Sequence, residues 1–244
     1  MPEGPSIVIL KEQVMPYKNS VVQKATGNAK INLDVIKKKK IIDFKSWGKQ
    51  FLICFEGFYI RIHLLMFGSY SINQRKTFKP RLSLKVKNGE INFYNCSVKL
   101  IEGDVNSSYN WEVDVMSDTW NPERAEKKSK ALKNTEITDV LLNQEIFSGA
   151  GNIIKNEVLF ITKIHPKSIV KFIPLKKMKQ LIKEVRTYSF NFYTWKKAFQ
   201  LRKHWLIYSK TTCPRCKIKA EKEYLGKTKR ISYFCNNCQN LFLS

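Results

Sequence analysis

The C-terminal part of the chain contains two short cysteine motifs, CPRC (213–216) and CNNC (235–238), which are separated by 18 residues. Two CxxC pairs at this spacing are typical of a zinc ribbon, in which one tetrahedral Zn²⁺ ion substitutes for a core too small to fold alone. The sequence between them, EKEYLGKTKRISYF (221–234), predicts two strands around a turn near Gly226. The expected ligands of this structural zinc ion are Cys213, Cys216, Cys235 and Cys238.

The turn near Gly226 would bring Lys227, Lys229 and Arg230 together. In the simplest interpretation the module is structural and these charges are solvated. The whole chain, however, has 44 Lys and Arg against 20 Asp and Glu, a formal charge of +24, and residues 151–244 carry +17 of it. Such a charge favours a polyanion, most commonly nucleic acid. A solubilising surface, or adhesion to ribosomes or anionic lipid, is the alternative.

The composition limits the class of protein further. With 244 residues and 43% hydrophobic side chains, the chain can bury a core in one large domain or in two to three small ones. No apolar run is long enough to span a membrane, and the start lacks the pattern of a secretory signal. We therefore expect a cytoplasmic protein. Cys54 and Cys96 lie in apolar stretches and are expected to be reduced core residues.

The pattern of the chain changes near residue 116. Before this point, after a helix at about 5–16, the β-rich stretches are FLICF (51–55), YIRIHLL (59–65), RLSLKVK (81–87) and EINFYNCSVKLI (90–101). Residues 114–124 form a linker in which Pro122 opens a helix. Helices are then expected at 123–134, 136–144, 152–163 and from Pro174 towards Trp195. The sequence therefore predicts an α+β multidomain fold.

Three domains are expected. Residues 1–116 form a β-sandwich with an N-terminal helix, residues 117–209 form a helical domain, and residues 210–244 form the zinc module. The stretch SGAGNIIKNEVLF (148–160) lies in the helical part. Its small residues precede Asn152, which is placed to cap the next helix, and such turns bind anions. Many helix pairs have similar turns, so this motif alone is weak.

Two motifs of the β-rich part have both an ordinary structural interpretation and a functional one. Lys49 follows Gly48 where an apolar strand begins, so it is either a solvated loop lysine or a phosphate contact. Next to Gly68, a strand ends in three apolar residues. They are ordinary core residues or, if the turn is exposed, an apolar wedge able to fill a gap in a base stack. These residues are Leu65, Met66 and Phe67.

The chain begins MPEGPS, where Pro2, Gly4 and Pro5 stiffen a terminus that would normally fray. Glu3 stands beside the residue that becomes the N-terminus if Met1 is removed. An α-amine has a pKa near 8. A helix that starts near Pro5 would favour the neutral, nucleophilic form of this amine.

Taken together, these motifs resemble the formamidopyrimidine-DNA glycosylase and endonuclease VIII family of base-excision repair. The resemblance covers the whole chain in order. The matching motifs are PEGP (2–5), GK (48–49), HLLM (63–66), GAGNIIKNEVLF (149–160), IHP (164–166) and the cysteine module (213–238). Any one of them is compatible with chance, whereas the collinear set is not.

The resemblance implies a role for each matching residue. Pro2, freed by removal of Met1, is the nucleophile that forms a Schiff base, and Glu3 is the carboxylate that carries protons. The resemblance further implies a damaged-DNA partner whose lesion base is flipped out, bound by a monomer. The phosphate contacts are Lys49, Asn152 and Arg230, and the residues that fill the gap are Leu65, Met66 and Phe67.

Two departures from the family's pattern bear on substrate choice and on activity. Many members carry a second acid where this chain has Ser6. The formamidopyrimidine branch usually has a DPRRFG-like motif that supplies an Arg and a Phe at the lesion, whereas the corresponding stretch here is NFYNCSVKLIEG (92–103), without that pair. The chain therefore looks closer to endonuclease VIII and to a preference for oxidised pyrimidines. The expected activity is a bifunctional glycosylase and AP lyase acting by β,δ-elimination. The alternatives are a purine-preferring enzyme, a catalytically silent DNA-binding relative, and an RNA- or ribosome-binding zinc ribbon.

Overall fold

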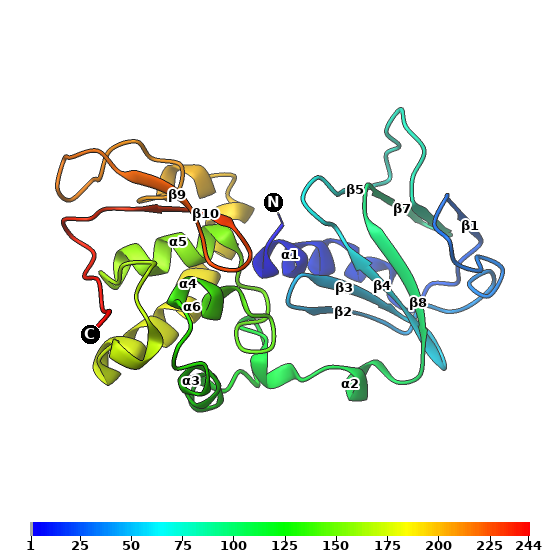
Figure 1. Ribbon diagram of the computed structural model, residues 1–244. Helices are drawn as coiled ribbons and strands as arrows, with labels where there is room; N and C mark the ends of the chain where they lie inside the picture. The colour runs from blue at the N-terminus through cyan, green and yellow to red at the C-terminus, as the bar shows by residue number, and fades with distance from the viewer. Residues whose placement is uncertain (1) are drawn as a thin grey trace. The chain divides into compact units, whose positions relative to one another are not determined.

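The structure is a computed structural model that describes residues 2–244. It divides into two compact units, Met1–Asn110 and Trp111–Ser244, here called the first and the second unit (Figure 1). The residues described include no helix that is both long and apolar enough to cross a membrane.

The first unit is a β-sandwich with one long helix. The helix α1 (Gly4–Val14) continues into a 3₁₀ turn (Met15–Tyr17), and a short helix α2 (Val105–Ser108) follows the last strand. One antiparallel sheet has the order β1-β6-β7-β5 and the other β2-β3-β4-β8. The strands are β1 (Lys24–Thr26), β2 (Asp43–Trp47), β3 (Gln50–Cys54), β4 (Phe58–His63), β5 (Ser69–Ile72), β6 (Leu82–Val86), β7 (Gly89–Tyr94) and β8 (Ser97–Glu102).

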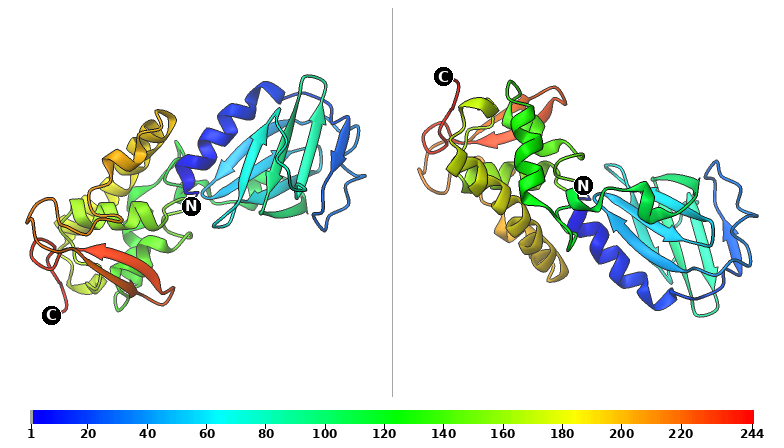
Figure 2. Two further views of the ribbon diagram at one scale, coloured as in Figure 1. Left: turned by 90° about the horizontal axis from the view of Figure 1, so that it is seen from above. Right: turned by 90° about the horizontal axis from the view of Figure 1, so that it is seen from below.

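The two sheets share one hydrophobic core. Phe51 of β3 and Phe93 of β7 are fully buried, and their ring centroids lie 5.8 Å apart. The helix α1 packs against β2 and β3 (Figure 2). It buries Ile7 and Leu10 in the same core. This packing fixes the position of the start of α1 relative to the sheet edge formed by β2 and β3.

The second unit is helical and carries the cysteine hairpin. Its helices are α3 (Pro122–Ala131), α4 (Ile137–Leu142), α5 (Asn152–Ile161) and α6 (Leu175–Lys197), with 3₁₀ turns at Trp111–Val113, Val170–Phe172 and Leu201–His204. The apolar residues of α6 recur at helical spacing and cover α5. The hairpin of β9 (Glu221–Leu225) and β10 (Arg230–Phe234) packs on α5 through β10 (Figure 1).

The structure confirms the predicted α+β fold with its sandwich, its helical part and its cysteine hairpin. Asn121 caps α3 by accepting the Arg124 N–H at 2.9 Å, which explains why this helix opens at Pro122. The stretch 90–101 forms two strands in different sheets, because Asn95 adopts a left-handed conformation (φ 48°) between them. The strands β1, β2 and β5 were not expected from the sequence pattern.

Candidate functional site

The start of α1 buries a carboxylate. Glu3 is the residue before the first turn of the helix, and its side chain is completely buried. Its backbone oxygen accepts the Ser6 N–H at 2.8 Å. Pro2 precedes it and is half-buried. The local sequence explains this arrangement, since Pro5 in the first turn has the φ angle of a helix and needs no hydrogen-bond partner for its nitrogen.

Ser6 occupies the position at which many family members have an acid. Only 6% of its surface is exposed, and within residues 2–244 its hydroxyl has no hydrogen-bond partner. A buried hydroxyl without a partner costs free energy. The first turn of α1 therefore keeps a polar atom at this position that no residue from 2 to 244 satisfies.

Lys49 lies in the two-residue turn between β2 and β3, where Gly48 has φ 53°. Its neighbour Gln50 pairs with His63 at the end of β4. Burial lowers the pKa of His63, and the positive charges of Lys49 and Arg61 lower it further. His63 is therefore a neutral imidazole at pH 7 that stands close to the Lys49 ammonium.

The three residues after Leu64 form an exposed apolar turn. Leu65 and Met66 are about half exposed and Phe67 is 81% exposed, whereas Leu64 is buried. Leu65 has φ 53°, and its N–H donates to Nδ1 of His63 at 3.0 Å. Of the two interpretations of these residues, the structure therefore agrees with the exposed turn and not with ordinary core residues. The neutral His63 accepts the Leu65 N–H and so stabilises the unusual backbone conformation of Leu65.

In the second unit, Asn152 is the first residue of α5, and Gly151 takes the capping position expected for Asn152. The expectation that Asn152 caps the helix is therefore wrong. Its side-chain amide instead donates to the carbonyl of Ile231 in β10 at 2.9 Å. This bond holds Asn152 beside Arg230, the neighbouring residue in β10.

Two further residues of α5 bind the same strand and were missed in the sequence. Lys155 is completely buried, and its Nζ donates to the Ser232 hydroxyl at 2.8 Å. Asn156 accepts the Tyr233 N–H at 2.7 Å. Their spacing from Asn152, three and four residues, puts all of them on one helix face, and this spacing was the available signal.

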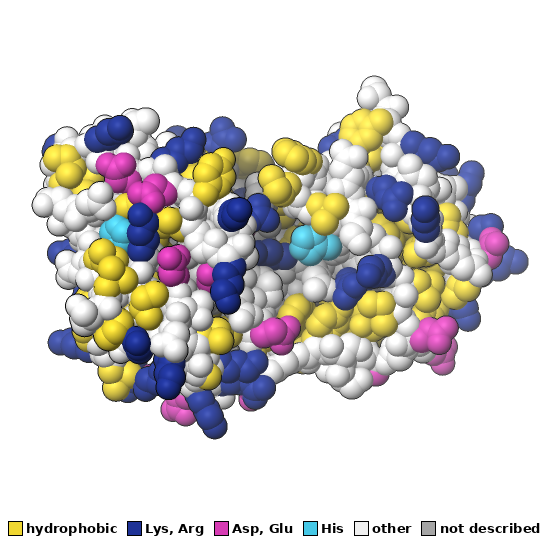
Figure 3. Space-filling model, in the orientation of Figure 1, with side chains coloured by type: hydrophobic (Ala, Val, Ile, Leu, Met, Phe, Trp, Pro, Cys, Tyr) yellow, Lys and Arg dark blue, Asp and Glu magenta, His cyan; other side chains and the backbone are white. Residues whose placement is uncertain are grey.

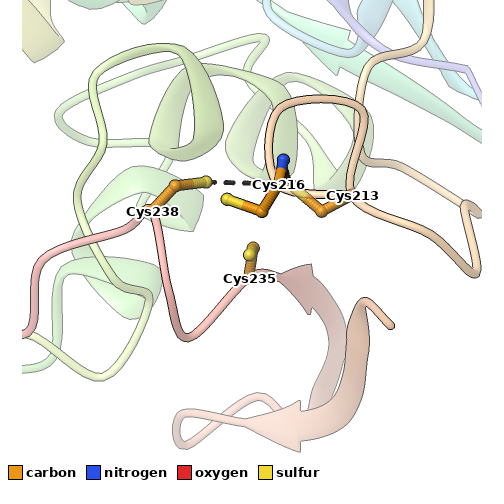
Figure 4. Close-up of side chains that lie close together, drawn as sticks. All are labelled: Cys213, Cys216, Cys235 and Cys238. Atoms are coloured by element: carbon orange, nitrogen blue, oxygen red, sulfur yellow. Dashed lines mark hydrogen bonds between the residues drawn. The ribbon is translucent and has the colours of Figure 1, made fainter. Parts of the chain in front are cut away.

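The four cysteines of the two CxxC motifs converge. Their sulfur atoms all lie within 4.8 Å of one another, and Figure 4 shows the side chains pointing towards a common centre. Sγ of Cys213 and Sγ of Cys238 are 3.7 Å apart. In a tetrahedral thiolate site with metal–sulfur bonds of about 2.3 Å, neighbouring sulfurs are about 3.8 Å apart. The cluster therefore fits a four-coordinate metal ion.

A buried acid of α5 fixes the chain segment that leads to the cysteines. The carboxylate of Glu157 accepts the backbone N–H groups of Leu206, Ile207 and Tyr208 at 2.8, 2.9 and 2.7 Å. Burial raises the pKa of Glu157, and these three N–H groups oppose that rise. Both the segment before the cluster and strand β10 within it are thus attached to α5.

The remaining cysteines differ from these four. Cys54 and Cys96 are buried in the first unit, and burial raises the pKa of each thiol to about 11. They are inert thiols, as expected. Basic side chains are distributed over the visible surface of both units with few acidic ones among them, as Figure 3 shows.

The fold and the cysteine centre together define the class of the chain: an α+β protein with a β-sandwich, a helical part and a four-cysteine hairpin. Residues 113–188 match the formamidopyrimidine-DNA glycosylase H2TH domain. Over 98% of its length the chain also shares the fold of a Lactococcus lactis formamidopyrimidine-DNA glycosylase solved with DNA containing an AP site (TM-score 0.86, 18% identity, 99% of that chain).

The sequence gives two further similarities. Endonuclease 8-like 3 of Mus musculus is 34% identical over 201 residues, which cover 79% of this chain. The chain spans 33% of the length of that relative. Formamidopyrimidine-DNA glycosylase of Histophilus somni strain 2336 is 27% identical over 98% of this chain and 99% of its own length. The chain belongs to the formamidopyrimidine-DNA glycosylase and endonuclease VIII family.

Proposed function

We propose that the protein is a base-excision-repair DNA glycosylase with AP lyase activity, with Pro2 as the nucleophile and Glu3 as the proton carrier. The observation that carries the proposal is the complete burial of Glu3 at the start of α1, directly after Pro2. Burying a carboxylate costs free energy, so a fold that keeps one beside a potential nucleophile favours chemistry at that point. Binding alone requires neither residue.

The reaction follows from the chemistry of a secondary amine. After removal of Met1, the Pro2 nitrogen attacks C1′ of the damaged nucleotide, and the base leaves with the bonding electrons and takes a proton. The amine loses its proton and O4′ gains one as the sugar ring opens, which gives a C1′=N⁺ iminium. This iminium has no N–H proton to lose and stays electrophilic, so loss of a C2′ proton expels the 3′-phosphate and then the 5′-phosphate leaves. Glu3 carries protons in these steps.

The remaining site residues bind the DNA in this proposal. Lys49, Asn152 and Arg230 contact phosphates near the lesion. The base must leave the stack before Pro2 can reach C1′. The exposed Leu65–Phe67 turn supports a role in filling the gap that the base leaves.

The proposal also identifies the metal ion and gives each domain of the chain a role. Zn²⁺ is the ion that four thiolates in a tetrahedral arrangement favour, and it would organise the hairpin that carries Arg230. Residues 1–116 are the catalytic part, 117–209 the helix–two-turn–helix part and 210–244 the zinc finger. The protein acts as a monomer on cytoplasmic, nucleoid DNA. Metal analysis should return one zinc ion per chain.

The experiment is borohydride trapping on DNA with an abasic site. Mature protein should have the mass of the chain without Met1, and the covalent adduct should lie on the N-terminal peptide. An N-terminal tag turns the Pro2 nitrogen into an amide and should abolish both trapping and strand cleavage while DNA binding persists. An adduct with the tagged protein would make another amine, such as Lys49, the nucleophile. Binding without any adduct for the untagged protein would favour the silent relative.

For the substrate, we propose oxidised pyrimidines such as thymine glycol rather than 8-oxoguanine paired with cytosine. The support is the stretch 92–103, which lacks the DPRRFG-like motif that supplies an Arg and a Phe at the lesion in the formamidopyrimidine branch. Single-turnover excision rates on matched oligonucleotides test the preference. Faster excision of 8-oxoguanine would reverse the preference and leave the Pro2 mechanism intact.

A further inference from the structure

The turn of the β9–β10 hairpin rests on two carboxylates of the second unit. Oδ2 of Asp139, in the first turn of α4, accepts the backbone N–H of Lys227 at 2.9 Å. Burial raises the pKa of Glu136, the residue before α4, the charge of Asp139 raises it further, and the neighbouring backbone N–H of Gly226 opposes that rise. The turn is therefore bound by Asp139 and lies next to Glu136, two acids that lie almost ninety residues earlier in the chain.

The fit at this contact is close. Gly226 has φ +71°, and a Cβ atom there would lie 2.2 Å from Oδ1 of Asp139, a distance that side chains do not adopt. Lys229 also adopts a left-handed conformation, with φ 47°, and its N–H donates to the Gly226 carbonyl at 3.2 Å. A lysine keeps such a backbone only when its surroundings fix it. The contact with Asp139 fixes the first half of this turn.

The charges near the turn make these acids unexpected. Lys227, Lys229 and Arg230 are all basic, and the proposed function places phosphate here. A carboxylate near a phosphate opposes its binding through space. An acid at this place is consistent with phosphate binding only if it contributes more by shaping the turn than it loses by repulsion.

The rest of the hairpin has other supports. Strand β10 is held to α5 by Asn152, Lys155 and Asn156, and the four cysteines hold its base. The turn that precedes Arg230 is bound instead by Asp139 of α4. The contact between Asp139 and the turn therefore affects how the basic residues are oriented, and the hairpin forms without it.

We propose that Asp139, with Glu136, is a positioning residue for phosphate binding by Arg230, because it fixes the backbone of the turn from which Arg230 emerges. This inference rests on the proposed function. The direction of the change in DNA affinity distinguishes this positioning role from a purely electrostatic effect. Loss of an acid beside a phosphate site strengthens binding if only charge matters, whereas it weakens binding if the acid positions the turn.

The test compares two neutral substitutions by binding to duplex DNA that contains a tetrahydrofuran abasic-site analogue. Asp139→Ala removes the acceptor and should weaken binding about tenfold, with a loss of about one from the slope of log K against log salt. Asp139→Asn keeps an acceptor for the Lys227 N–H and should rescue most of that loss. Glu123→Ala removes an acid from the exposed start of α3 and serves as the charge control.

Two further readouts separate positioning from general damage. In an Arg230→Ala background, Asp139→Ala should cause no additional loss, since both changes then remove the same contact. Without DNA, amide hydrogen exchange over residues 225–230 should rise in Asp139→Ala while the metal content stays unchanged.

The inference is overturned if Asp139→Ala binds as well as or better than the wild type, or if its loss adds fully to that of Arg230→Ala. If Arg230→Ala by itself has no effect, the phosphate contact of the proposed function fails and the positioning role fails with it. Faster exchange in the turn would then still show that Asp139 orders its backbone.

Discussion

Among the residues that the structure describes, each unit buries one carboxylate completely, and the surroundings of the two differ. Glu157 in the second unit accepts three consecutive backbone N–H groups within hydrogen-bond distance, which is a structural arrangement. Glu3 in the first unit stands at a helix start directly after Pro2. The difference teaches that burial alone does not indicate chemistry. The three backbone donors give Glu157 a role in organising the chain, whereas the proposed function gives Glu3, next to Pro2, a role in moving protons.

The largest expected effect tests the chemical half of this comparison. Glu3→Gln keeps the size of the side chain and removes its proton affinity, so base excision should slow by about 10²–10⁴. Single-turnover kinetics measures the rate, and thermal unfolding of the same variant should be nearly unchanged. A variant that excises normally but melts early would make Glu3 a structural residue like Glu157.

Glu157→Ala tests the structural half. It leaves three backbone N–H groups without their acceptor, that of Ile207 buried and those of Leu206 and Tyr208 partly buried, and unpaired buried groups cost about 1–3 kcal/mol each. With partial relaxation, a loss of about 3–5 kcal/mol should lower the Tm of the second unit by roughly 10 °C. Calorimetry measures this change. An intact Tm would show that the segment 206–208 is held by other contacts.

Arg230→Ala should have a smaller effect that is confined to binding. Charge-assisted hydrogen bonds contribute about 1.5–3 kcal/mol, and one lost phosphate contact lowers the salt slope by about one. Titrations of abasic-site DNA at several salt concentrations measure both. The metal content should not change, since the side chain is not a ligand. An unchanged slope would remove Arg230 from the phosphate contacts.

The smallest effect concerns His63, whose pKa is lowered by burial and by Lys49 and Arg61. The folded state thus prefers the neutral imidazole, and the unfolded state binds the proton more readily. Stability from His63 is present above its unfolded pKa near 6.5 and is lost as the pH falls through the folded value. Thermal melts at pH 7.5 and 5.5 should show an excess loss on the order of 1 °C against His63→Gln. Equal losses would exclude His63 as the acceptor that stabilises the Leu65 turn.

The sequence predicted those parts of the molecule that depend on local patterns. The spacing of the four cysteines predicted their convergence, and Pro122 predicted the start of α3. Contacts between residues that lie far apart in the sequence could not be predicted from it. Nothing near Asp139 indicates that it binds Lys227, because pairing at that distance is decided by tertiary packing.

Local chemistry also misled at two places. Asn152 is a good capping residue, but it is the first residue of α5, its side-chain NH2 group donates to the carbonyl of Ile231, and Gly151 takes the capping position. The stretch 90–101 has continuous strand propensity, yet Asn95 tolerates a left-handed backbone and turns the chain into the second sheet. In both cases the residue type was compatible with more than one role, and tertiary structure selected between them.

The attachment of the cysteine hairpin to α5 has a consequence for protein engineering. Lys155 and Asn156 hold strand β10, and Glu157 on the next position of the same helix holds the segment 206–208. The hairpin is therefore not a portable module. Grafted onto another scaffold, it would bring its four cysteines but not the polar side chains of α5 that bind it, so a functional transplant must carry α5 as well.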